Sequence, residues 1–296
     1  MSTALPDRRT GSRIPLAALL VVLSMTGACQ GNPPGAAEMS MDEAAAARAR
    51  LEGSEGGRLV LRAIEAGGGL ELWYATPTSA YGWEYSNTAS DIRFKSFLVA
   101  NNRTREVYHR LVSLGTPREP LPVEGRFAWD GEEAWIQPAE IEAINPRFWA
   151  TTGYYFSSIP FVLADPGIVY ELLPDAELDG EMYDMVRVGY EAGIGDASDT
   201  YVLYVDKETS RVEAIRYTVT YGGRPARGET LMYYRDYVTV DGFTVPTHLV
   251  GHTFVEGVPG EARNEAWVTD ISFTQPFDTT QLEMPADGRV QPFPPA

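Results

Sequence analysis

The chain has 296 residues, enough for one large domain or two modest ones, and its 44% hydrophobic composition is ample for a packed core. Its 24 Lys and Arg against 41 Asp and Glu give a net charge of −17, which disfavours binding to nucleic acid. A single cysteine excludes an intramolecular disulfide framework and any cysteine-rich zinc or iron–sulfur site.

The start of the chain has the pattern of a secretory signal peptide. Arg8, Arg9 and Arg13 form a basic region, an apolar run covers residues 14–23, and small residues lead up to Cys29. The apolar run is shorter than the roughly 20 residues that span a bilayer. It therefore predicts an export signal and not a transmembrane anchor.

The small residues before Cys29 resemble the lipobox of bacterial lipoproteins, in which the cysteine is acylated and becomes the first residue of the mature chain. The resemblance implies a signal peptide over residues 1–28 and a lipidated Pro/Gly tether over residues 29–39, anchored by acyl chains such as palmitate. Gln30 resembles the sorting signal of outer-membrane lipoproteins, so we expect an anchor in the outer membrane facing the periplasm. The alternative is an ordinary signal peptide cut near Ala28.

Helical signals follow the tether. Ser40 and Glu43 have the spacing of a capping box, which predicts a helix that starts near residue 41. Glycines at positions 53, 56 and 57 interrupt the helical pattern, and three glycines at 67–69 end it. We expect one broken helix or two short ones.

From about residue 70 the pattern becomes that of β-strands. Apolar and polar residues alternate over 186–190, 215–221 and 267–273. Asp-Gly pairs at 130, 179 and 241 lie between such runs and are typical of tight hairpin turns, which join antiparallel strands. Residues 139–167 interrupt the strands with aromatic residues and prolines, and we expect broken helices there that cross one face or the mouth of the sheet.

These elements predict an α+β fold that is mainly antiparallel β. A sheet of roughly 8–12 strands twists and curls. We expect it to form a curled half-barrel with a helical lid on its concave face and an N-terminal helix, within a single domain over residues 40–296.

Four short segments occur in an order known from one superfamily: an Asp-Gly hairpin with a following proline at 129–138, a strand with Asp-x-x-Thr at 203–209, Asp-Gly-x-x-x-Pro at 241–246, and FDTTQLEMP at 277–285. In this order they resemble the LolA/LolB-like superfamily of periplasmic lipoprotein-sorting and lipid-binding proteins. Residues 154–167 are similar to an uncharacterised branch of it. The resemblance spans about residues 55–290 and implies an open barrel whose apolar cavity accepts acyl chains.

Catalytic and metal-binding patterns are weak in this sequence. His248 and His252 are four residues apart on a predicted strand, a separation of roughly 13 Å, so they cannot share one ion. No nucleophile elbow is present, and the aspartates between residues 196 and 206 lack the spacing of a calcium loop. We expect no enzymatic activity, no metal and no cofactor, although a hydrolase with a histidine or carboxylate pair in the cavity is a third possibility.

The aromatic residues, 6 Trp, 16 Tyr and 11 Phe, are the remaining candidates for function. Inward-facing aromatic residues form the core in most proteins, but in a half-barrel they can also line a ligand cavity. The candidates for the cavity wall and its lid are Trp83, Tyr85, Trp135, Phe156, Phe161, Ile215, Tyr217, Tyr221, Trp267 and Phe273.

The favoured hypothesis is a membrane-anchored periplasmic lipoprotein that binds an acyl chain, a lipid or a lipoprotein without catalysis. The alternative is a structural envelope lipoprotein whose barrel is filled by its own side chains and whose surface binds a protein partner.

Overall fold

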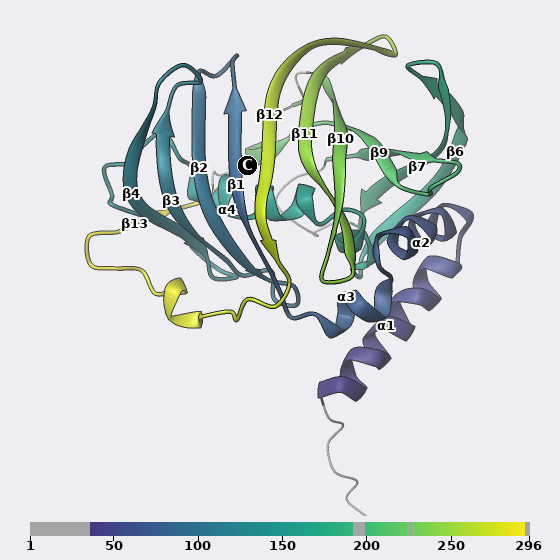
Figure 1. The fold of residues 1–296 in the computed structure, drawn as a ribbon, viewed down its shortest axis with the longest axis horizontal. Coiled ribbons are helices and arrows are strands. Elements are labelled where there is room, and N and C mark those ends of the chain that lie inside the picture. Colours follow the sequence, from purple (N-terminus) through teal and green to yellow (C-terminus); the bar gives the residue numbers. More distant parts are fainter. Residues whose placement is uncertain (1–35, 192–198, 224, 227, 294–296) are drawn as a thin grey trace, which may run out of the picture. The chain divides into compact units, whose positions relative to one another are not determined.

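The computed structural model describes residues 36–191, 199–223, 225–226 and 228–293 (Figure 1). The predicted signal peptide, Cys29 and the tether up to residue 35 lie outside the described residues, as does Asp196.

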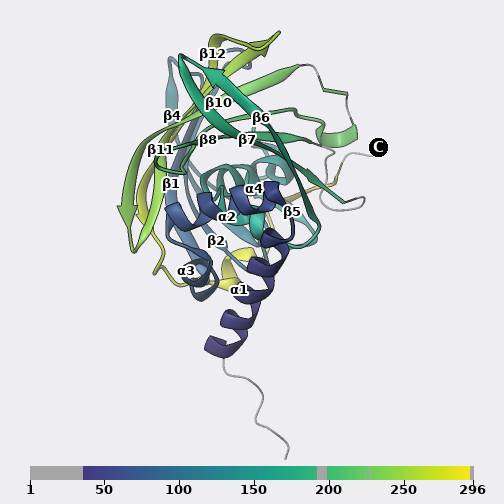
Figure 2. The same ribbon diagram turned by 90° about the vertical axis from the view of Figure 1, so that its right-hand side faces the viewer.

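Thirteen strands form one antiparallel sheet in the order β13-β5-β4-β3-β2-β1-β12-β11-β10-β9-β8-β7-β6. The strands are β1 (Thr78–Asn87), β2 (Ile92–Asn101), β3 (Val107–Gly115), β4 (Pro120–Trp129), β5 (Ala134–Gln137), β6 (Ile168–Leu178), β7 (Glu181–Tyr190), β8 (Tyr201–Asp206), β9 (Val212–Tyr217), β10 (Glu229–Val240), β11 (Phe243–Val255), β12 (Val258–Ser272) and β13 (Arg289–Gln291). Figures 1 and 2 show the sheet curling around a central helix. The prediction of a mainly antiparallel curled half-barrel is confirmed, with 13 strands where roughly 8–12 were expected.

The three predicted Asp-Gly turns join neighbouring strands. Gly131 lies between β4 and β5, and it has a φ of 98°. The turns between β6 and β7 and between β10 and β11 place both residues in the left-handed region, with φ of 54° and 89° at Asp179 and Gly180 and of 51° and 88° at Asp241 and Gly242. Paired positive φ angles match the twist of the flanking strands, which explains why Asp-Gly occurs there.

Within the described residues, three helices precede the sheet: α1 (Ala36–Glu52), α2 (Glu55–Gly67) and α3 (Leu70–Ala75). The expected break at Gly53 is confirmed, and Ser54 caps α2 by accepting a hydrogen bond of 3.0 Å from the backbone N–H of Gly57. The expected start near residue 41 is corrected, because Ser40 lies inside α1. Alanine and glutamate before it favour helix, so the helix begins further upstream.

The helix α4 (Pro146–Ser157) and the 3₁₀ helix η1 (Phe161–Ala164) lie within the aromatic segment where broken helices were predicted. Asn145 caps α4 by accepting from the N–H of Phe148, and Pro146 occupies the first helical position, where its missing N–H costs nothing. Both helices pack on the concave face of the sheet, and the main core lies between that face and the helices.

Buried side chains of the sheet bond directly to the backbone of α4. Tyr81 on β1 donates to the carbonyl of Gly153 at 3.1 Å, and Tyr234 on β10 donates to the carbonyl of Phe156 at 2.8 Å. From β3, the ring nitrogen Nε2 of His109 lies 2.9 Å from the carbonyl oxygen of Ala150. These bonds come from three different strands on the concave face, so α4 is a fixed part of the concave wall.

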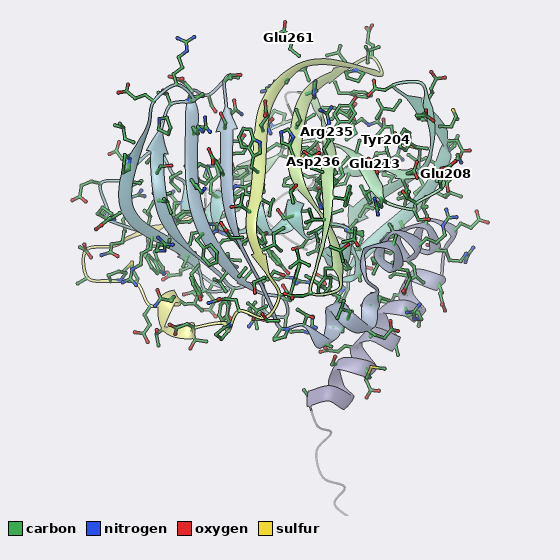
Figure 3. All side chains as sticks on the ribbon, viewed as in Figure 1. Tyr204, Glu208, Glu213, Arg235, Asp236 and Glu261 are labelled. Carbon is green, nitrogen blue, oxygen red and sulfur yellow. The ribbon has the colours of Figure 1, made fainter. Side chains whose placement is uncertain are left out.

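A second apolar cluster lies on the outer face of β6–β10. It contains Leu178, Met185, Val202, Tyr204 and Leu231, all buried. Figure 3 views this outer face, where Tyr204 on β8, Glu213 on β9 and Arg235 on β10 are labelled. This end of the sheet therefore carries a buried apolar cluster on its outer face as well as the main core on its inner face.

The buried histidine makes the stability of the fold depend on pH. Burial lowers the pKa of His109 to about 4, so its neutral ring accepts a hydrogen bond from Ser96 at 2.9 Å through Nδ1 and donates to Ala150 through Nε2. In the unfolded chain a histidine has a pKa of about 6.5. Between this pH and the folded pKa, His109 is protonated in the unfolded chain but neutral in the folded protein. The free energy of unfolding therefore falls as the pH decreases through this range.

We expect the His109→Gln variant to lack this pH dependence. Between pH 7 and pH 5 the unfolding free energy of the unchanged protein should fall by about 2 kcal/mol more than that of the variant. Urea unfolding at each pH measures the difference, and the comparison of slopes is independent of any constant loss that the substitution causes. Parallel pH profiles would show that His109 does not titrate in this way.

Candidate functional site

A solvent-accessible cavity of about 610 Å³ lies between α4 and the inner faces of β1, β7–β10 and β12. Aromatic side chains far outnumber aliphatic ones in its wall. The aromatic residues are Trp83, Tyr85, Trp129, Phe148, Trp149, Tyr154, Tyr155, Phe156, Tyr190, Tyr201, Tyr217 and Tyr221. The exposed residues Ser90, Val219 and Arg263 also line the cavity, so its mouth is at that side.

The structure brings half of the residues predicted for the wall to this cavity. They are Trp83, Tyr85, Phe156, Tyr217 and Tyr221. Ile215 faces the same side but is fully buried in the core. Phe161 and Phe273 line a separate space of about 10 Å³ beside Trp73 and Tyr81, too small for an organic ligand.

The expected position of Trp267 is corrected, because this side chain lies on the outer face of β12 and stacks on His248 with ring centroids 5.6 Å apart. The sequence alternation put Trp267 and Phe273 on one face. A bulge in the pairing of β1 with β12 falls between them, where Asp270 has a φ of 51°. One extra residue reverses the side-chain parity of a strand, so only Phe273 faces inward.

The expected position of Trp135 is also corrected, because this side chain likewise lies on the face away from the cavity. The register of β4 with β5 pairs Phe127 with Ile136, and both are buried in the main core. The neighbouring Trp135 therefore points to the other face, where its Nε1–H donates to the carbonyl of Leu282 at 2.7 Å. It packs beneath the C-terminal segment and does not line the cavity.

A group of tyrosines forms the end of the cavity at β7 and β8. The hydroxyls of Tyr155 on α4 and Tyr190 on β7 are hydrogen-bonded to each other, and the ring of Tyr201 on β8 lies 5.6 Å and 6.2 Å from theirs. Burial raises the pKa of Tyr190 to about 12 and that of Tyr201 well above its usual value. These hydroxyls stay neutral near pH 7, so they can both donate and accept hydrogen bonds.

The sequence did not predict this group, because its members come from three separate elements, α4, β7 and β8. One signal was available, since Tyr190 continues the alternating run of Val186 and Val188, whose side chains face the core. Nothing in the sequence placed Tyr155 opposite it. That contact depends on where α4 lies across the sheet.

Asp199 precedes β8 and also lines the cavity. Its carboxylate oxygen Oδ1 accepts from the N–H and the hydroxyl of Thr220 at 2.7 Å and 2.9 Å, and from the hydroxyl of Thr218 at 3.4 Å. Burial raises the pKa of this carboxyl, while the hydrogen bonds from Thr220 act against the rise. Asp199 is one of the aspartates whose spacing in the sequence does not fit a calcium loop, and it is half-buried in the structure.

A second carboxylate at the cavity is neutralised. Asp165 accepts from Arg105 through Nη2 at 2.6 Å and Nε at 3.2 Å. Arg105 also donates to the hydroxyl of Tyr154. This bidentate pair ties the β2–β3 loop to the segment after η1 and closes the base of the cavity.

Polar groups in the wall include one unpaired donor. The indole Nε1–H of Trp83 is buried and has no hydrogen-bond acceptor among the described residues. A buried donor without an acceptor costs about 1–3 kcal/mol. A ligand or water oxygen beside it would remove that cost.

Among the described residues, no three His, Cys, Asp or Glu side chains are grouped as metal ligands. His248 on β11 lies 3.2 Å from Glu265 on the outer face, and His252 bonds to the carbonyl of Gly260. Within the described ranges no helix is long and apolar enough to cross a bilayer.

Comparisons with known proteins identify the fold. No protein-family model and no curated protein matches the chain. A LolA superfamily protein from Nitrosomonas europaea superposes with a TM-score of 0.50 at 9% identity, covering 76% of this chain and 96% of that one. A DUF1329 family protein from Desulfovibrio piger superposes with a TM-score of 0.51 at 10% identity, covering 77% and 97%. At such identities the likeness concerns the fold alone, and the chain has the LolA-like fold that its motifs implied.

The contact between Gly153 and Trp83 gives a test of the cavity wall. A Cβ atom at Gly153 would lie 3.0 Å from the indole of Trp83, a side chain that is 2% exposed. Overpacking costs about 1–3 kcal/mol, whereas alanine gains up to about 1 kcal/mol over glycine inside a helix. We expect Gly153→Ala to lose about 1–2 kcal/mol of unfolding free energy.

The matched control is Gly189→Ala on β7, where an added Cβ meets nothing within 4 Å. This variant should unfold at the same urea concentration as the unchanged protein or slightly above it. Equal stability of both alanine variants would contradict the close packing of α4 on Trp83.

Proposed function

We propose that this protein binds a hydrophobic ligand, namely a lipid, an acyl chain or the acylated end of a lipoprotein, without catalysis. The observation that carries the proposal is the aromatic cavity of about 610 Å³ between α4 and the sheet. Its volume lies in the range of small-molecule sites, roughly 300–1,000 Å³, and its wall is mainly aromatic with polar and charged residues between the rings. Burying ligand surface there contributes about 25 cal/mol per Å².

The LolA-like fold supports the same assignment, since the solved structure from Nitrosomonas europaea carries the name of that superfamily. An open cavity is not what the alternative of a filled barrel predicts. The buried histidine does not favour catalysis, because both ring nitrogens of His109 are occupied by Ser96 and Ala150.

We further propose that the ligand enters past the rim, and not by a swing of α4. The helix is bonded to Tyr81, His109 and Tyr234 of the sheet, and breaking those bonds would leave buried polar groups unpaired. The rim at Ser90, Val219 and Arg263 is exposed already. Entry there requires only side chains to move.

Filling the cavity tests the binding site. Thr230 on β10 lines the cavity, so Thr230→Trp should weaken binding of a neutral fluorescent naphthylamine dye by roughly tenfold or more. Thr239→Trp, at an exposed position of the same strand, is the matched control and should bind like the unchanged protein. Mass spectrometry of denaturing extracts from protein purified from its native envelope identifies the natural ligand. Absence of both extracted lipid and dye binding would refute the proposal.

We also propose that Cys29 is acylated and anchors the protein in the outer membrane of a bacterial envelope, facing the periplasm. The support is in the sequence: the only cysteine directly follows a signal-like apolar run and small residues, and a Pro/Gly stretch separates it from the folded residues. Two or three acyl chains hold a protein on a membrane far better than one.

The anchor predicts that Cys29→Ser releases the protein from the membrane fraction into the soluble periplasm. The urea unfolding curve of the released variant should match that of the unchanged protein, because residue 29 precedes the first helix. Fractionation after a salt wash and incorporation of labelled fatty acid measure the effect. If the variant still sediments with membranes, or if the unchanged protein takes up no label, the lipid anchor is refuted. The protein would then be secreted after cleavage of an ordinary signal peptide.

A further inference from the structure

Five aromatic rings surround the end of the cavity at β7–β9. Tyr201 is the central ring: its centroid lies 5.6 Å from Tyr155, 6.2 Å from Tyr190 and 6.1 Å from Tyr217, with the last pair nearly parallel at 18°. Phe156 lies 5.0 Å from Tyr217 and closes the group from α4. The faces of such rings carry negative electrostatic potential, which attracts cations.

The same end of the cavity carries a negative charge that no cation of the described residues balances. Within those residues, Asp199 accepts hydrogen bonds from Thr218 and Thr220 and forms no ion pair. Burial is the main cause of the raised pKa of Tyr190, the hydrogen bond with Tyr155 lowers this pKa, and the charges of Asp165 and Asp199 raise it further. The tyrosine group therefore lies within electrostatic range of the carboxylate.

The described arginines that line the cavity form no ion pair with Asp199. Burial raises the pKa of Tyr217, and the charge of Arg263 reaches this tyrosine and acts against the rise. Arg105 is paired with Asp165, and Arg147 stacks over the ring of Trp129 at 3.6 Å, towards β4. Arg263 is exposed at the mouth. Arg224 and Arg227 lie outside the described residues.

We propose that the β7–β9 end of the cavity binds the ammonium group of an amphiphilic ligand, with Asp199 as the counter-ion and the rings around Tyr201 as an aromatic cage. This assignment rests on the proposed function and narrows its ligand class to lipids or other amphiphiles with a cationic head. A half-buried carboxylate without a cation is costly, and an ammonium ion in contact with it offsets that cost. Aromatic cages bind quaternary ammonium groups in this manner.

The test uses three decyl probes that differ in head group: decyltrimethylammonium, decanol and decyl sulfate. Each is titrated below its micelle concentration as a competitor of the neutral naphthylamine dye. Asp199→Asn keeps the acceptor oxygen for Thr220 and removes the charge. We expect it to weaken decyltrimethylammonium binding by about 3- to 30-fold and to leave decanol binding unchanged.

Two further variants separate the cage from general effects. Tyr201→Leu keeps apolar volume but removes the central ring, so it should also weaken only the cationic probe. Asp236→Asn makes the same change of net charge at an exposed position on the outer face of β10 (Figure 3), and it should change no affinity.

The outcomes distinguish the two proposals. If the dye and decanol bind but Asp199→Asn leaves the cationic probe unaffected, or if decyl sulfate binds more tightly than decyltrimethylammonium, the cation site is refuted and the hydrophobic cavity stands. If neither the dye nor decanol binds the unchanged protein, the proposed function itself fails.

Discussion

Hydrogen bonds from buried side chains of the sheet to carbonyls of α4 determine where this helix lies, and the cavity follows from that position. Apolar contacts alone are non-directional and would let a short helix slide over the concave face. Tyr81, His109 and Tyr234 act as donors at defined points along α4, and each would be left buried and unpaired if the helix moved. The structure therefore holds the aromatic segment as a wall.

The position of α4 divides the concave face into two parts. On the β2–β5 side, Phe94, Phe127 and the stacked ring of His109 fill the space beneath the helix. On the β7–β10 side, the helix presents Tyr155 and Phe156 to strands that carry tyrosines, and the space between them remains open. A filled side gives stability and an open side gives room for a ligand, so one helix serves both purposes.

The local signals in the sequence predicted the fold well. Asp-Gly pairs specified hairpins because their positive φ angles suit the twist of antiparallel strands, and the proline-rich aromatic segment specified broken helices. The candidate site was predicted less completely. The bulge at Asp270 reverses the parity of β12 and cannot be read from alternation, so Trp267 was expected on the inner face. The tyrosine group brings together residues distant in sequence, which only the tertiary structure shows.

The side chains of the cavity wall limit which ligands the cavity can bind. The hydroxyls of Tyr155 and Tyr190 are hydrogen-bonded to each other, so an alkyl chain beside them leaves neither hydroxyl without a hydrogen-bond partner. Asp199 is different, because its carboxylate has no cation partner among the described residues, and an alkyl chain against it would remove water without replacing the lost solvation. A purely aliphatic ligand can thus occupy the aromatic part but not the space beside Asp199. The proposed ligand avoids this loss of solvation, because its cationic head lies beside Asp199 and its apolar part lies against the remaining aromatic rings of the wall.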